Sequence, residues 1–117
     1  RYASRGLGDV YKRQMEGSNV TIGDEVLIGA FGYFIGSGPY VTDDLELPFK
    51  KQGMQPLGGI AIADNVWFGS HVQVLDGVSI GTGSIVGAST VVNKAVADYD
   101  VVAGVPMRVL KNRRDNS

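Results

Sequence analysis

Apolar residues recur at every sixth position through the second half of the chain, and this spacing limits the possible folds more than any other feature. The uninterrupted series is Ile62, Phe68, Val74, Ile80, Val86 and Val92. Two residues before each member stand Ile60, Val66, Val72, Val78, Ser84 and Thr90. Six residues rotate an α-helix through about 600°, which would scatter these side chains over three faces. The spacing therefore excludes a helix.

Apolar residues at positions i−2 and i fit a short strand with one buried face. The residue at i+1 is mostly small, as at Ala63, Gly69 and Gly81, and we expect a corner there because glycine accepts backbone angles that side chains resist. A strand and a corner every six residues predict an all-β, single-stranded parallel β-helix in which three hexads close one triangular coil. An antiparallel meander would need hairpin turns, and Asp76-Gly77 is the only Asn-Gly or Asp-Gly pair.

The same pattern appears upstream, from Val20 to Phe34, and the phase then breaks until Ile62. Residues 37–59 hold three of the four prolines and a dense cluster of charges, which predicts one excursion loop leaving the coil. The loop has either a functional role or that of a structural lid. We expect the β-helix domain to cover residues 15–106, with this loop inside it, and a short basic tail at 107–117 to close the helix.

The start of the chain does not look native. Residues 4–14 read SRGLGDVYKRQ and resemble the translation of an adapter used in sequencing libraries. We therefore treat residues 1–14 as a non-native segment and leave it out of the fold. The chain is then expected to be an N-terminally truncated fragment whose first coil is left uncapped.

Composition removes several classes of protein. There is no cysteine, which excludes disulfides and thiolate chemistry. The formal net charge of −1 gives no general support for binding nucleic acid. No apolar run is long enough to span a membrane and no secretory signal is visible, so we expect a cytoplasmic protein without a membrane span.

From Val20 to Arg114 the chain resembles the hexapeptide-repeat acyltransferases, nearest to the maltose and galactoside O-acetyltransferases. The resemblance rests on VWFGSHV at 66–72, VVAGVPMRV at 101–109 and LPFKKQG at 47–53. It implies a left-handed β-helix, a homotrimer, and acetyl-CoA bound as co-substrate between coils of neighbouring subunits. The implied enzyme is an acyltransferase that moves an acetyl group from acetyl-CoA to a hydroxyl of a sugar or glycan.

That reaction needs a base for the hydroxyl proton, a role that suits histidine. In the family a histidine lies early in the excursion loop, where Pro39 or Tyr40 stands in this chain. Phenols ionise only at about pH 10, so tyrosine is a poor base near neutrality. His71, the only histidine, is either a surface residue or a substitute base. A zinc site of three histidines is excluded, and no metal is expected.

The resemblance also assigns residues to the coenzyme. Ser70 and Ala88 match positions whose backbone lines the pantetheine arm, and Lys94 and Arg108 match positions near the phosphates. The two cations are otherwise solvated surface charges. Trp67 points outward from the coil, toward either a packing surface or the coenzyme cleft.

A second hypothesis follows from the missing loop histidine. A catalytically degenerate hexapeptide-repeat protein would bind a coenzyme or partner without turnover. Acetyl-CoA turnover and coenzyme binding, measured side by side, distinguish the two hypotheses.

Overall fold

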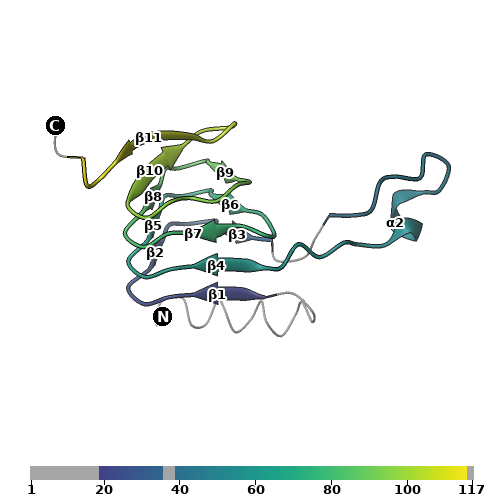
Figure 1. Ribbon diagram of the computed structural model, residues 1–117, viewed down its shortest axis with the longest axis horizontal. Helices are drawn as coiled ribbons and strands as arrows, with labels where there is room; N and C mark the ends of the chain where they lie inside the picture. Colours follow the sequence, from purple (N-terminus) through teal and green to yellow (C-terminus); the bar gives the residue numbers. More distant parts are fainter. Residues whose placement is uncertain (1–18, 36–38, 116–117) are drawn as a thin grey trace.

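The computed structural model describes residues 19–35 and 39–115, and the predicted non-native segment 1–14 lies outside them. Regular structure in the described residues is almost entirely short β-strand (Figure 1). The strands are β1 (Val20–Ile22), β2 (Leu27–Ile28), β3 (Tyr33–Phe34), β4 (Ile60–Ile62), β5 (Trp67–Phe68), β6 (Gln73–Val74), β7 (Ser79–Ile80), β8 (Ile85–Val86), β9 (Val91–Val92), β10 (Asp100–Ala103) and β11 (Arg108–Asn112). A short helix, α2 (Phe49–Gln52), lies between β3 and β4.

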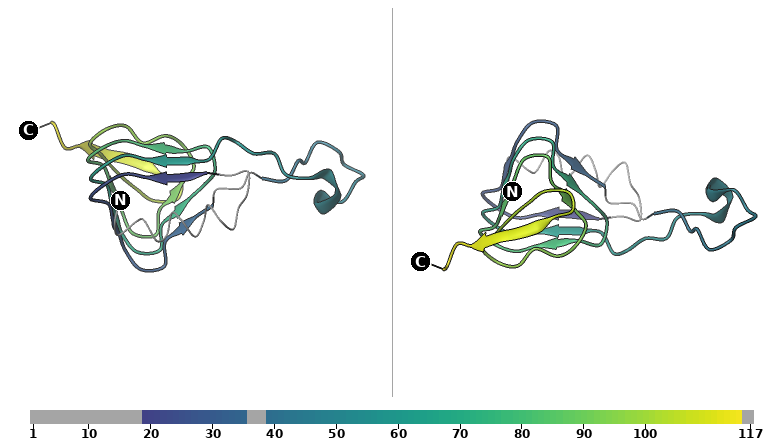
Figure 2. Two further views of the ribbon diagram at one scale, coloured as in Figure 1. Left: turned by 90° about the horizontal axis from the view of Figure 1, so that it is seen from below. Right: turned by 90° about the horizontal axis from the view of Figure 1, so that it is seen from above.

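The strands form the three sides of a prism (Figure 2). Sheet A has the order β1-β4-β7, sheet B β11-β10-β8-β5-β2, and sheet C β3-β6-β9. Successive coils pair in parallel. Seen from the N-terminal side, the chain turns counterclockwise as it recedes, which is the left-handed sense (Figure 2). The left-handed β-helix implied by the resemblance is confirmed.

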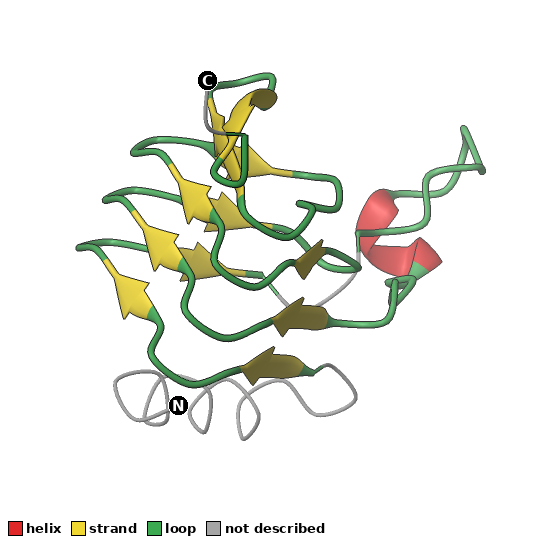
Figure 3. Ribbon diagram, turned by 60° about the vertical axis from the view of Figure 1, so that its left-hand side comes forward, coloured by secondary structure: helices red, strands yellow, loops and turns green. Residues whose placement is uncertain are grey.

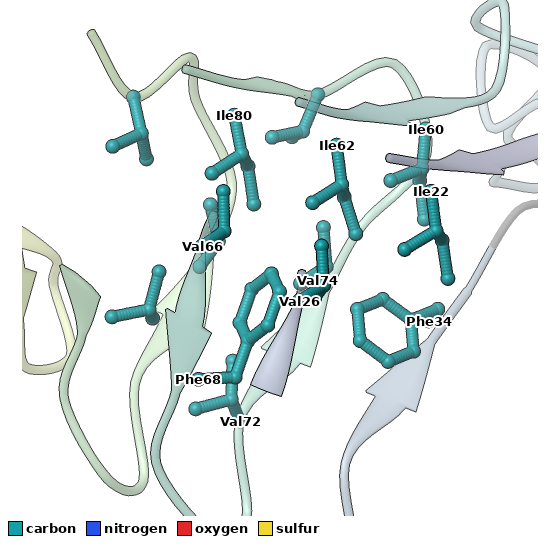
Figure 4. Close-up of a cluster of buried hydrophobic side chains, with 14 of the residues drawn as sticks. Ile22, Val26, Phe34, Ile60, Ile62, Val66, Phe68, Val72, Val74 and Ile80 are labelled. Atoms are coloured by element: carbon teal, nitrogen blue, oxygen red, sulfur yellow. The ribbon is translucent and has the colours of Figure 1, made fainter. Parts of the chain in front are cut away.

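The residues spaced six apart line one interior. Ile62 and Phe68 stack over Ile22 and Ile28 of the coil below, and Val74 stacks over Phe34. All the members of the series are buried in the same hydrophobic cluster (Figure 4). The rings of Phe34 and Phe68 meet edge to face, with centroids 5.4 Å apart and planes at 86°. Apolar burial along this column is the main force that holds the coils together.

The expected backbone role of the glycines at i+1 is wrong. Gly69 and Gly81 do not have positive φ angles; a Cβ at Gly69 would lie 2.7 Å from the amide nitrogen of Ala88 in the next coil. These positions need glycine because the coils approach closely there. The left-handed backbone falls two residues later, at positions such as Asn65 (φ 56°) and His71 (φ 60°). Each edge of the prism therefore turns at a residue that the hexad pattern did not single out.

The last coil ends in the antiparallel pair of β10 and β11. Met107, at the turn between them, is buried against the interior column. The side-chain amide of Asn112 donates to the carbonyl oxygen of Asp98 and to Oδ1 of Asp100, both at 2.9 Å. Arg114 lies over the ring of Tyr99 at 5.0 Å. The tail thus folds back along sheet B and closes the top of the prism (Figure 1).

Residues 39–59 form an arm that projects away from the prism (Figure 3). Its two legs are joined by a bridge between Tyr40 and Met54 and by a hydrogen bond from the Val41 amide to the Gly53 carbonyl oxygen, 2.8 Å. At the tip, the Gln52 side chain contacts the main chain of Asp44 and Leu47. The arm carries a row of exposed apolar side chains, including Tyr40, Leu45, Leu47, Phe49, Met54 and Leu57.

Candidate active site

The candidate site lies along the BC edge, the edge where sheet B passes into sheet C. Ser70 follows β5 and Ala88 follows β8, so the two residues occupy the same place in successive coils. The Ser89 amide donates to the Ser70 carbonyl oxygen at 2.8 Å. Ser70 is partly exposed and Ala88 is exposed. The edge therefore presents small side chains in a row, one coil apart.

His71 stands on the same edge, beside Ser70. Its ring stacks on that of Phe31 from the coil below, with centroids 5.1 Å apart and planes at 21°. Its backbone amide donates to the Ala30 carbonyl oxygen at 2.9 Å. Because the side chain is exposed, its ring nitrogens can reach a ligand lying on the edge.

Trp67 and Arg108 flank the BC edge. Trp67, in β5, points outward from sheet B and is 55% exposed. Arg108 pairs with Ala103, and an ideal Cβ on Gly87 would lie 3.0 Å from the Cβ of Ala103. Arg108 therefore lies one strand beyond Ala103, at the C-terminal end of the same edge. A cation in that place suits a phosphate group at one end of an extended ligand.

Lys94 lies on a different edge of the prism. It stands between β9 of sheet C and Val96, which bridges to Ile80 of sheet A. This places it on the CA edge, where sheet C passes into sheet A. Within one chain, the structure brings together Ser70, His71 and Ala88 with Arg108 but does not bring Lys94 to them.

Tyr40 also belongs to the CA edge, because the arm leaves after β3 of sheet C and returns at β4 of sheet A. It is half-exposed at the base of the arm. The two candidate bases, Tyr40 and His71, are thus held on different edges of one prism. A site that used both would draw on more than one copy of the chain.

Sequence reasoning missed Asp76 as a side chain that organises this region. Asp76-Gly77 was weighed only as a hairpin signal, yet the pair forms an ordinary turn of the coil between β6 and β7. Asp76 is 8% exposed, and its carboxylate accepts hydrogen bonds from two amides at the end of the arm. The turn sequence was visible, but these long-range partners were not.

Carboxylates elsewhere do not gather into a cation site in the described ranges. Asp44 Oδ1 accepts from the amides of Glu46 and Leu47, at 2.9 and 3.1 Å, which is a local turn. Among residues 19–35 and 39–115 there is no group of three or more His, Cys, Asp or Glu side chains arranged to hold a metal ion. In the same residues no helix is long and apolar enough to cross a membrane.

Comparison with known proteins places this geometry among transferases. Residues 59–94 match the family described as bacterial transferase hexapeptide (six repeats). The galactoside O-acetyltransferase of Escherichia coli (strain K12) is 41% identical over 96 residues, which cover 82% of this chain and 45% of that protein. The chain spans 31% to 56% of the length of such curated relatives.

Solved structures agree. A hexapeptide-repeat acetyltransferase of Vibrio cholerae complexed with acetyl coenzyme A has a TM-score of 0.72 and 35% identity, over 86% of this chain and 53% of that one. A galactoside acetyltransferase in complex with coenzyme A has a TM-score of 0.71 and 39% identity, over 83% of this chain and 46% of that one. Both neighbours thus carry a coenzyme of the class expected for this chain.

Proposed function

We propose that this chain, a hexapeptide-repeat protein homologous to galactoside O-acetyltransferase, belongs to an enzyme that transfers the acetyl group of acetyl-CoA to a hydroxyl of a sugar or glycan. The observation that carries the proposal is the BC edge, where Ser70 and Ala88 stack beside the exposed ring of His71. Two similar structures bind coenzyme A or its acetyl ester. The acetyl-CoA-dependent reaction is expected in the cytoplasm.

In the proposed reaction His71 removes the proton of the acceptor hydroxyl as its oxygen bonds to the thioester carbonyl carbon. When the carbon–sulfur bond breaks, His71 returns the proton to the sulfur, so that an acetyl ester and a free thiol leave the site. Tyr40 is the second candidate for this proton transfer. Ser70 and Ala88 line the pantetheine arm, Trp67 packs beside it, and Arg108 and Lys94 meet the phosphates.

We further propose that the working form is a homotrimer. A triangular prism has three similar sides, and cyclic symmetry repeats one groove at each of three interfaces. Because Tyr40 and Lys94 lie on the CA edge and His71 on the BC edge, a second copy is needed to assemble them into one site. The arm supports this as well: Leu45 is 93% exposed and, with Leu47 and Phe49, lines a hollow of about 440 Å³ that a neighbouring chain would cover.

The test is acetyl-CoA turnover by the full-length protein over a panel of sugars, with His71→Asn and Tyr40→Phe beside the native enzyme. Asparagine tolerates the positive φ of position 71 better than alanine does, so the backbone is preserved. Loss of the base should lower kcat by about 10²- to 10⁴-fold. If His71 is the base, Tyr40→Phe should keep most of the activity; the reverse result would assign the role to Tyr40.

The second candidate function, coenzyme binding without turnover, is favoured by the absence of histidine from residues 36–44. A calorimetric titration of the native protein with coenzyme A, made beside the turnover assay, distinguishes the two candidate functions. Binding together with an absence of turnover on every acceptor would favour the degenerate protein. Turnover of any sugar would exclude the catalytically degenerate protein.

A further inference from the structure

Asp76 is the buried polar side chain that ties the arm to the coil. The buried polar residues of the described part are Asp76, Ser84 and Thr90. The hydroxyls of Ser84 and Thr90 donate to carbonyl oxygens three residues earlier in their own coil. Asp76 instead accepts hydrogen bonds from residues 17 and 19 positions away. The Thr90 hydroxyl also accepts from the Gly104 amide at 3.2 Å, but that bond stays within the coil, whereas the bonds of Asp76 reach into the arm.

Both oxygens of the carboxylate are used. Oδ2 accepts from the amide of Leu57 at 2.7 Å, and Oδ1 accepts from the amide of Gly59 at 2.6 Å. The Gly77 amide returns a hydrogen bond to the Gly59 carbonyl oxygen at 2.8 Å. Hydrogen bonds to an ionised acceptor are shorter and stronger than neutral ones. Three bonds thus hold the last residues of the arm against the corner that follows β6.

In the described residues the returning leg also lies against the coil where Leu57 approaches Gly77 and where Gly59 approaches Asn19. Residues 53–58 are exposed, so apolar burial contributes little to their position. Gly58, between the two bound amides, has φ 105° and nothing within 4 Å of where a Cβ would stand. The backbone there is one that glycine adopts readily. Asp76 is therefore the side chain that holds the returning leg through hydrogen bonds, on both sides of a glycine that adopts this backbone readily.

The returning leg in turn places Tyr40. The outgoing leg is joined to it by the bridge between Tyr40 and Met54 and by the bond from the Gln55 amide to the Pro39 carbonyl oxygen, 2.8 Å. A connected series of contacts therefore runs from Asp76 through Leu57 and Gly59 to the base of the arm. The coenzyme residues of the BC edge lie outside this series.

We propose that Asp76 is a positioning residue that fixes the direction of the arm and so sets how the acceptor is held. This inference rests on the proposed function for the acceptor, whereas the tether itself is independent of it. A carboxylate that held only the local fold would affect coenzyme and acceptor alike. A positioning residue should affect the acceptor side alone.

The experiment compares Asp76→Asn and Asp76→Ala with Ser84→Ala in the full-length protein. Asparagine keeps the size of the side chain but places an NH₂ group opposite one of the two amide donors. Ser84→Ala removes a buried hydrogen bond of the coil and leaves the arm untouched, which makes it the matched control. Hydrogen exchange is measured at the amides of Leu57, Gly59, Val41 and Gln55, and steady-state kinetics are measured for acetyl-CoA and acceptor separately.

Both Asp76 variants should accelerate exchange at the four arm amides by about tenfold or more, with the Gly69 and Gly81 amides of the coil unchanged. They should lower kcat/KM for the acceptor by about a hundredfold, because a small misplacement of the substrate costs about this much. KM for acetyl-CoA should stay within about twofold of the native value. Ser84→Ala should lower the melting temperature without an unequal effect on the acceptor and acetyl-CoA kinetics.

Unchanged exchange at Leu57 and Gly59 would overturn the tether. Faster exchange with acetyl-CoA and acceptor kinetics impaired equally would overturn the positioning role. If the native protein turns over no acceptor, the proposed function and the acceptor role fall together, while the exchange data still decide whether Asp76 holds the arm.

Discussion

The coil and the arm of this chain are stabilised in different ways. In the coil, every hexad meets a neighbour above or below it. Inward apolar residues and parallel backbone hydrogen bonds repeat from coil to coil, with a closely packed glycine at positions such as Gly69 and Gly81. In the arm, the large apolar side chains are exposed and a few specific polar bonds set its shape. Repetition therefore makes the coil tolerant of small polar changes, whereas the arm depends on single side chains.

The largest stability effect is expected for Phe68→Ala. Phe68 is fully buried, and its ring meets Phe34, so truncation leaves a cavity in the column. Unfolding in denaturant should show a loss of about 3 to 5 kcal/mol. The matched variant Met54→Ala, in the arm where the side chain is 47% exposed and lies outside the hollow lined by Leu45, Leu47 and Phe49, should stay within about 0.5 kcal/mol of native. Equal losses would erase the contrast between the two regions.

Gly69→Ala tests close packing between coils. Its methyl group would come within 2.7 Å of the Ala88 nitrogen, and backbone cannot move aside as a side chain can. We expect a loss of about 1 to 3 kcal/mol, read from the denaturation midpoint. Gly32→Ala is the control, because its nearest neighbour is the Ile28 side chain at 3.3 Å. A tolerated Gly69→Ala would show that the neighbouring coils can move apart enough to admit a methyl group, and would overturn the close-packing role of Gly69.

Asn112→Ala probes the C-terminal end of the coil. The substitution removes the hydrogen bonds to Asp98 and Asp100 that hold β11 on the last coil, together with the two that the side-chain oxygen accepts from Arg114. A loss of about 1 kcal/mol is expected in thermal unfolding, and Lys111→Ala at the next, exposed position should have no measurable effect. Similar melting temperatures for both variants would show that β11 is held by its backbone alone.

The smallest effect on global stability is expected for Gln52→Ala. Its amide bridges Asp44 and Leu47 at the exposed tip of the arm, so the unfolding free energy should change by less than about 0.5 kcal/mol. Limited proteolysis should nevertheless cut the arm faster than in the native protein. A Gln52→Glu variant keeps the length of the side chain but not its donor, and should behave like alanine. Native-like cleavage of both would show that the tip has other supports.

Part of the site follows from the repeat. The outward direction of Trp67 was readable from alternation along its strand, and Ser70 and Ala88 fall in one row because three hexads make one coil. The residues at which the coil turns could not be predicted from the sequence. The left-handed positions hold residues as different as Phe31, His71 and Ser89, whose side chains give no common signal for that backbone.

The arm, too, was predicted from the sequence only in part. Its prolines and charges marked residues 37–59 as a loop, but nothing local marked Asp76 as its anchor. The partners of that carboxylate are main-chain amides, which every residue but proline possesses. A sequence cannot single out such a partner.

The amino-acid sequence by itself determined which side chains enter the interior and how many hexads close a coil, because alternation and period are local properties repeated in every turn. Tertiary structure alone decided which edge each candidate residue occupies, where coils crowd too closely for a Cβ, and where the arm is anchored. Those outcomes depend on groups far apart in the chain that meet only once the coils have stacked.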